Sequence, residues 1–206
     1  MKTLESCPSI ASRTHVSNRV AFPAAILLVA ACLFLTPAFL KQSNAASYIE
    51  TAIAAHRGVL NGSLPLEIQS GSSSVITAWF TGKVPFTFRL PNSAKDLEHQ
   101  KANRLNGGRL VNYKGGFAAL VAYQMRQEKI SLLVSSGRSA VAAGGEEVAS
   151  GRLIFHYSKK ATFNIDTWSN HGLTYALDSP LAGSGRLSCM VCHQDMPTGD
   201  HFSAHR

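Results

Sequence analysis

The distribution of apolar and polar residues first separates a continuous apolar segment near the N-terminus from a longer part with mixed patterns. Residues 21–40 read AFPAAILLVAACLFLTPAFL, twenty residues without a charge. A helix of that length spans about 30 Å, the thickness of a bilayer's hydrocarbon core. A helix packed on a globular core normally has a polar face, which this segment lacks. The pattern therefore predicts a transmembrane helix.

The charges before this segment predict its orientation. Three Lys and Arg residues precede it, with a single Glu. The positive-inside rule then makes residues 1–20 a cytoplasmic tail and puts the main domain in the periplasm, on a single-pass protein of the inner membrane. We expect the segment to stay as a signal anchor, because it exceeds the roughly 7–15 apolar residues of a signal peptide. The other interpretation is a signal peptide that is cut near Asn44-Ala45-Ala46, where small residues suit a peptidase.

The part beyond the apolar segment opens with helical periodicity. Apolar residues and His56 recur at three- and four-residue spacing between Ile49 and Leu60. This spacing predicts a helix over residues 47–60, and Gly62 is a suitable stop.

Three short elements are predicted next. Residues 64–69 read as a strand, and residues 74–80 as one or two helical turns with Ser74 as the N-cap. Residues 84–90 alternate between apolar and polar side chains, which predicts a half-buried strand. Pro85 favours an edge position for it, because proline cannot donate a ladder hydrogen bond.

The second half of the chain has the pattern of an antiparallel meander. Lys114-Gly115-Gly116 and Asn170-His171-Gly172 are typical of tight turns. We expect a polar loop over residues 91–108 and a Gly/Ser/Ala-rich surface excursion over residues 135–145. The predicted strands are residues 110–113, 117–125, 130–134, 152–157, 161–168 and 173–177.

Together these elements predict an α+β domain over residues 47–180, one antiparallel sheet with one or two helices, followed by a tail over residues 181–206. The 206 residues are 45% apolar, which excludes a disordered chain. The net charge of +8 is spread out, with no basic run longer than Lys159-Lys160. We read it as a solvated surface near a membrane, with no nucleic-acid partner. No hydrolase or transferase motif occurs, so we expect no enzyme.

The tail carries the one motif with defined chemistry. Cys189-Met190-Val191-Cys192-His193 is the attachment pattern of c-type haem. Two thiols at this spacing suit thioether bonds to the two vinyl groups of one haem, and the adjacent imidazole becomes the proximal iron ligand. Such attachment takes place outside the cytoplasm, in agreement with the predicted topology. We therefore expect Cys189, Cys192 and His193 to hold haem c.

The second axial ligand is left open by the sequence. No candidate has a privileged spacing, and a five-coordinate iron would favour gas binding over electron transfer. The candidates are Met125, His171, Met196, His201 and His205.

Two other interpretations of the tail stand beside haem. Cys189, Cys192, His201 and His205 form a C-x₂-C-x₈-H-x₃-H set suited to tetrahedral zinc, with His193 as a substitute ligand. The cysteine pair alone also suits a disulfide or a metal-free thiol pair. The histidines that we expect to be solvated or satisfied by hydrogen bonds are His56, His99, His156 and His171.

Four short motifs occur in a fixed order along the predicted domain. They are WFTGKVPF at residues 79–86, GGRL at 107–110, ALVAY at 119–123 and, after Trp168, GLTYAL at 172–177. Over about residues 50–180 this set resembles the extracytoplasmic domain of bacterial transmembrane anti-sigma factors. The resemblance implies the sensing or interaction half of such a regulator, with a partner protein or redox partner in the envelope.

The chain departs from that family at its N-terminus. Those regulators hold a sigma factor through a cytoplasmic zinc-binding domain with a His-x-x-x-Cys-x-x-Cys pattern, whereas residues 1–20 hold only a lone Cys7 and a lone His15. Trp79, Phe80 and Lys83 are either a partner surface or two core anchors beside a solvated lysine. We expect a membrane-anchored periplasmic haem protein for redox or small-molecule sensing or electron handling. The alternative is a non-haem envelope interaction or regulatory protein.

Overall fold

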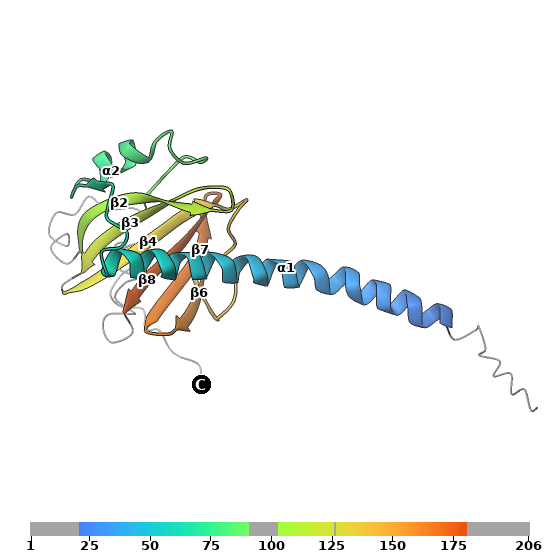
Figure 1. The fold of residues 1–206 in the computed structure, drawn as a ribbon. Coiled ribbons are helices and arrows are strands. Elements are labelled where there is room, and N and C mark those ends of the chain that lie inside the picture. The colour runs from blue at the N-terminus through green and yellow to red at the C-terminus, as the bar shows by residue number, and fades with distance from the viewer. Residues whose placement is uncertain (1–20, 91–102, 126, 181–206) are drawn as a thin grey trace, which may run out of the picture. The chain divides into compact units, whose positions relative to one another are not determined.

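The computed structural model describes residues 21–90, 103–125 and 127–180, with side chains from Phe39 onward in those ranges, Asn103 excepted. Two compact units divide the chain, residues 1–39 and residues 40–206, and each is described by itself. The second unit is an α+β fold with two helices and one antiparallel sheet of eight strands (Figure 1). The predicted fold class is confirmed at this level.

The strand order in the sheet is β1-β2-β3-β4-β8-β7-β6-β5. All neighbouring strands are antiparallel, and most follow one another in the chain; β4 and β8 meet in the middle. The elements are α1 Ala21–Leu60, β1 Ile68–Gln69, α2 Ser73–Phe80, β2 Asn103–Tyr113, β3 Gly116–Met125, β4 Glu128–Ser136, β5 Glu146–Ser150, β6 Leu153–Lys160, β7 Phe163–Asn170 and β8 Leu173–Pro180.

Alternate residues of each strand divide the core between the two faces of the sheet, as the pleat requires. In β3, Ala118 and Leu120 lie in a cluster with residues of α1, whereas Ala119 and Val121 lie in a cluster with residues of α2. The sheet is therefore the central layer between two helical layers (Figure 1).

The C-terminal part of α1 packs on one face through small and aliphatic side chains. Ala52 and Ala55 are 0% and 2% exposed and lie in one cluster with residues of β3, β4 and β8. Ile49 and Ile53 pack against side chains of β7. Small side chains let the helix backbone approach the sheet closely, so the predicted helix over residues 47–60 forms and is buried on its apolar face.

The other face is covered by α2 and the chain after it. Ile76 and Phe80 of α2 are fully buried, and Val84 and Phe88 join the same cluster. Residues 84–90 are irregular, so the predicted strand is wrong. The alternating pattern still predicts which side chains are buried. Every second side chain of this segment packs against the core, although its backbone is not part of a strand.

Several predicted boundaries also differ from the structure. The N-cap of α2 is Ser72, not Ser74, and its side chain makes no capping hydrogen bond. Strand β2 begins at Asn103, inside the predicted loop. Strand β5 was not predicted at all, since its sequence, EEVAS, is mostly polar or small.

The two predicted tight turns are confirmed. Lys114 and Gly115 have φ of 47° and 74°, and His171 and Gly172 have φ of 49° and 75°. Two successive residues with positive φ match the right-handed twist of the flanking strands. These turns set the registers β2–β3 and β7–β8.

Helix α1 joins the predicted apolar segment and the predicted helix over residues 47–60 into one element. Among the residues that the structure describes, no helix is long and apolar enough to cross a membrane. The side chains of residues 21–38, on which the membrane prediction rests, lie outside the described part.

Gly107 provides a test of how the sheet edge is built. Its φ is 152°, and a Cβ there would overlap the carbonyl oxygen of Ile68 and lie 3.0 Å from Cα of Gln69. We expect Gly107→Ala to lower the free energy of unfolding by about 2 kcal/mol, because backbone cannot move aside cheaply. Gly71→Ala is the control, since its nearest neighbour is 3.7 Å away. Equal denaturant midpoints for the two variants would contradict this account.

Candidate functional site

The predicted haem and zinc ligands lie outside the described residues. This holds for Cys189, Cys192, His193, His201 and His205, and also for Met196. The last described residue before them is Pro180, at the end of β8. The predicted roles of these residues as haem or zinc ligands therefore rest on the sequence motif alone.

Two of the candidate axial ligands are described, and their surroundings differ. Met125, at the end of β3, is 4% exposed and belongs to the core cluster on the α2 face. His171 is exposed in the turn between β7 and β8. Met125 would have to leave the core to reach an iron, so His171 is the better placed of the two.

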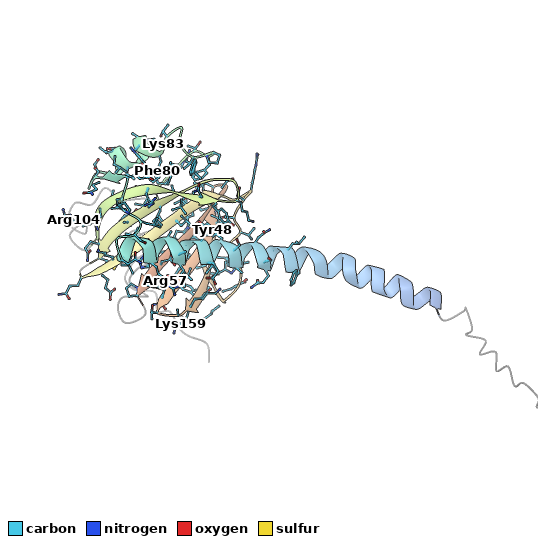
Figure 2. The ribbon with its side chains drawn as sticks, in the orientation of Figure 1. Tyr48, Arg57, Phe80, Lys83, Arg104 and Lys159 are labelled. Atoms are coloured by element: carbon cyan, nitrogen blue, oxygen red, sulfur yellow. The ribbon has the colours of Figure 1, made fainter. Side chains whose placement is uncertain are left out.

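The residues of the candidate partner surface separate into core and surface roles. Phe80 is fully buried, and Trp79 packs edge-on against it with ring centroids 5.0 Å apart. Lys83 is exposed, with Nζ 3.9 Å from the centre of the Trp79 ring. Figure 2 labels Phe80 and Lys83 on this layer, and Tyr48 and Arg57 on α1. This arrangement favours the reading of core anchors beside a solvated lysine.

An open groove of about 540 Å³ runs beside α2. Its lining combines hydroxyl-bearing residues of α2 and its C-cap with Ala78, Phe88, Arg89 and Leu90. The hydroxyl-bearing residues are Ser73, Ser74, Thr77 and Thr81. It adjoins residues 91–102, which lie outside the described part, so we assign it no ligand.

A polar cluster lies buried between α1 and the sheet. Nδ1 of His56 is 2.8 Å from Oγ of Ser131 on β4, and Ser131 pairs in register with Asp178 on β8. The exposed fractions of the three residues are 0%, 1% and 0%. An apolar helix–sheet contact thus includes an imidazole, a hydroxyl and a carboxyl.

Three buried atoms of this cluster have no hydrogen-bond partner. They are Nε2 of His56 and both carboxyl oxygens of Asp178. Burial lowers the pKa of His56 to about 4, since the charged imidazolium is poorly solvated there. Burial, and then the charge of Asp166, raise the pKa of Asp178 well above its usual range. Both shifts favour the uncharged forms.

Serine, histidine and aspartate are also the residue types of a hydrolase triad, but the geometry here does not support that chemistry. The hydroxyl of Ser131 is buried beneath α1, and the groove described above is lined by other residues. Among the described residues no group of three or more His, Cys, Asp or Glu is placed to hold a metal ion.

One feature of the sequence points to this cluster, and it is the place of His56 in the apolar periodicity between Ile49 and Leu60. His56 falls on the apolar face of the predicted helix over residues 47–60, where a polar residue calls for a buried partner. Its hydrogen-bond partner, Ser131, is 75 residues away in the chain, so the local spacing of residues does not reveal it. A second buried histidine, His156, lies with Nδ1 3.3 Å from Glu147, at a distance of an ion pair but without hydrogen-bond geometry.

Tyr48 fixes α1 over the centre of the sheet. Its hydroxyl lies 2.8 Å from the carbonyl oxygens of Leu133 on β4 and Thr174 on β8, so it shares one hydrogen between two central strands. The side chain is fully buried, and burial raises the pKa of its hydroxyl. The hydroxyl therefore stays protonated and donates.

The fold and these features define an α+β protein in which a helix is docked on an eight-stranded antiparallel sheet through buried polar groups. Comparisons with protein-family models, with curated proteins and with solved structures gave no match. The resemblance to anti-sigma domains accordingly stays a prediction.

The hydroxyl of Tyr48 can be tested by its removal. We expect Tyr48→Phe to lower the free energy of unfolding by about 1–2 kcal/mol, because the carbonyl groups lose a buried donor. Thr51→Val removes a hydroxyl from the same helix at an exposed hydrogen bond. It should lower the free energy of unfolding by only about 0.5 kcal/mol or less. Denaturant titrations would measure both, and an equal loss in the two variants would show that the buried bond has no special weight.

Proposed function

We propose that this chain is a membrane-anchored, extracytoplasmic c-type haem protein whose α+β domain serves redox or small-molecule sensing or electron handling. The observation that carries the proposal is Cys189-x-x-Cys192-His193, a set of two thiols and an adjacent imidazole. The donor chemistry fits haem, since thiols supply covalent attachment and a neutral imidazole supplies the axial bond.

In this proposal Cys189 and Cys192 hold the group and His193 binds its iron. Bound haem would supply a one-electron couple or a site for a diatomic gas. The chain's own contribution is attachment and orientation. His171 is the described residue that we propose as an accessible candidate for the second axial position, because its side chain is exposed at a turn.

The packing of α1 supports retention of the apolar segment. Asn44-Ala45-Ala46, the alternative cleavage site, lies within α1. Ala45 is 1% exposed, and Oδ1 of Asn44 accepts a hydrogen bond of 2.7 Å from Nζ of Lys114. Cleavage there would remove residues that belong to the packed helix, so we propose a signal anchor in the inner membrane.

Covalent haem is the direct test. Expressed in cells that mature c-type cytochromes, the full chain in the membrane fraction should stain for haem after denaturation and show a Soret band. Cys189→Ala and Cys192→Ala should abolish the full two-thioether attachment, and His193→Ala should change the spectrum of the iron. Cys32→Ala, a thiol outside the motif, is the matched control and should keep the stain.

Absence of covalent haem would overturn the proposal. Metal analysis then separates the alternatives: about one zinc per chain selects the set Cys189, Cys192, His201 and His205, and no metal selects a disulfide or thiol pair. Either of those results would favour a non-haem envelope protein that acts through a partner.

Retention of the anchor has its own measurement. We expect the mature protein to keep the mass of the uncleaved chain and to require detergent for extraction from membranes. An N-terminus at or near Ser47 would show that a signal peptidase removes the segment.

A further inference from the structure

The contact of α1 with the sheet includes two ionisable side chains that each carry buried atoms without a hydrogen-bond partner. Nε2 of His56 and both carboxyl oxygens of Asp178 are buried and unpaired. Ser131 is hydrogen-bonded to Nδ1 of His56 and is the register partner of Asp178. Buried polar groups are nearly always hydrogen-bonded, so two unpaired groups in one interface need an explanation. A charge on either of them would be costly there.

Among the described residues, the other buried acidic or basic side chains are His156 and Asp166. On α1, Glu50 and Arg57 are exposed, and Glu50 is paired with Lys160 of β6. Asp166 of β7 is next to Ile165, which faces α1, so its own side chain faces the opposite side of the sheet. The other titratable groups around the contact are Tyr48, Tyr113, the exposed Lys129 of β4 and the pair of His156 with Glu147.

We propose that His56 and Asp178 form a proton-linked latch: α1 docks on the sheet with a neutral imidazole and a protonated carboxyl, and release of α1 returns both groups to water in their charged forms. Between about pH 4 and 6.5, docking then moves one proton from His56 to Asp178 and leaves the number of bound protons unchanged. The latch is independent of haem and goes beyond the proposed function.

The pH dependence follows from counting protons in the two states. In the released state the pKa of the imidazole is about 6.5 and the pKa of the carboxyl is about 3.9. Between these values the released pair binds one proton, as the docked pair does, so docking is insensitive to pH. Above about 6.5 the released pair binds none, and docking weakens by up to about tenfold per pH unit until the docked carboxyl ionises.

Each single variant removes one half of this balance. In Asp178→Asn only the imidazole titrates, with a docked pKa of about 4 against about 6.5 when released. Docking should therefore weaken by about 30-fold when the pH falls from 7.5 to 5. In His56→Gln only the carboxyl titrates, and because burial raises its docked pKa, docking should weaken with rising pH from about 4 upward.

Amide hydrogen exchange of the full chain in detergent tests the latch. Protection of residues 45–60, corrected for intrinsic exchange rates, reports docking of α1, and peptides from β3 report the sheet itself. We expect wild-type protection to be constant from pH 5 to 6.5 and to fall above pH 6.5. In Asp178→Asn protection should fall as the pH is lowered, and in His56→Gln it should fall as the pH is raised. Lys159→Gln, at an exposed residue of β6, should match the wild type.

Infrared spectroscopy gives a second readout that does not depend on a variant folding well. Wild-type protein at pH 7 should show the C=O stretch of a protonated carboxylic acid, which Asp178→Asn lacks. The proposal is overturned if that band is absent, if wild-type protection is unchanged between pH 6.5 and 8, or if protection in a folded Asp178→Asn variant is flat between pH 7.5 and 5. None of these measurements involves haem, so failure of the haem test would not be confused with failure of the latch.

Discussion

The docking of α1 on the sheet is the contact on which the rest of the second unit depends. Tyr48 links α1 to β4 and β8, the two strands that join the halves of the sheet. Ala52 and Ala55 provide close approach, and Ile49 and Ile53 continue the contact onto β7. Helix α1 thus packs across the pair β4–β8. These two strands are far apart in the sequence, so no short turn holds them together.

The two faces of the sheet are built by different rules. The face toward α2 is apolar and aromatic, with Trp168 and Tyr175 stacked at 5.0 Å and nearly parallel. The face toward α1 mixes alanines with Ser131, Thr174 and Asp178. Apolar and aromatic packing is insensitive to pH, whereas under the proposed latch the polar groups of the other face make the docking of α1 depend on protonation.

Local signals predicted the local parts of this structure. The Lys114-Gly115 and His171-Gly172 turns were found because positive φ leaves a clear trace in sequence. The strand predicted over residues 84–90 was wrong because a period of two marks alternating burial, and burial under α2 gives the same pattern as pairing in a sheet. The polar cluster at His56 was not predicted, because the docking of α1 brings His56 to Ser131 and the register of β4 with β8 brings Ser131 beside Asp178. Both depend on the whole topology.

The same distinction applies to the two sites. The residues of a covalent haem motif are close together in the chain, so Cys189, Cys192 and His193 can be recognised from the sequence alone. They lie outside the described residues. A haem enclosed by this domain would need room in the core, but Met125, Leu132 and Tyr175 fill the α2 face, and Tyr48 and Leu120 fill the α1 face. Covalent attachment relaxes that need, because the bonds to cysteine retain the group without a deep pocket. The proposed haem therefore belongs to the tail, and the domain is left free to respond to another signal, such as protons at the α1 contact.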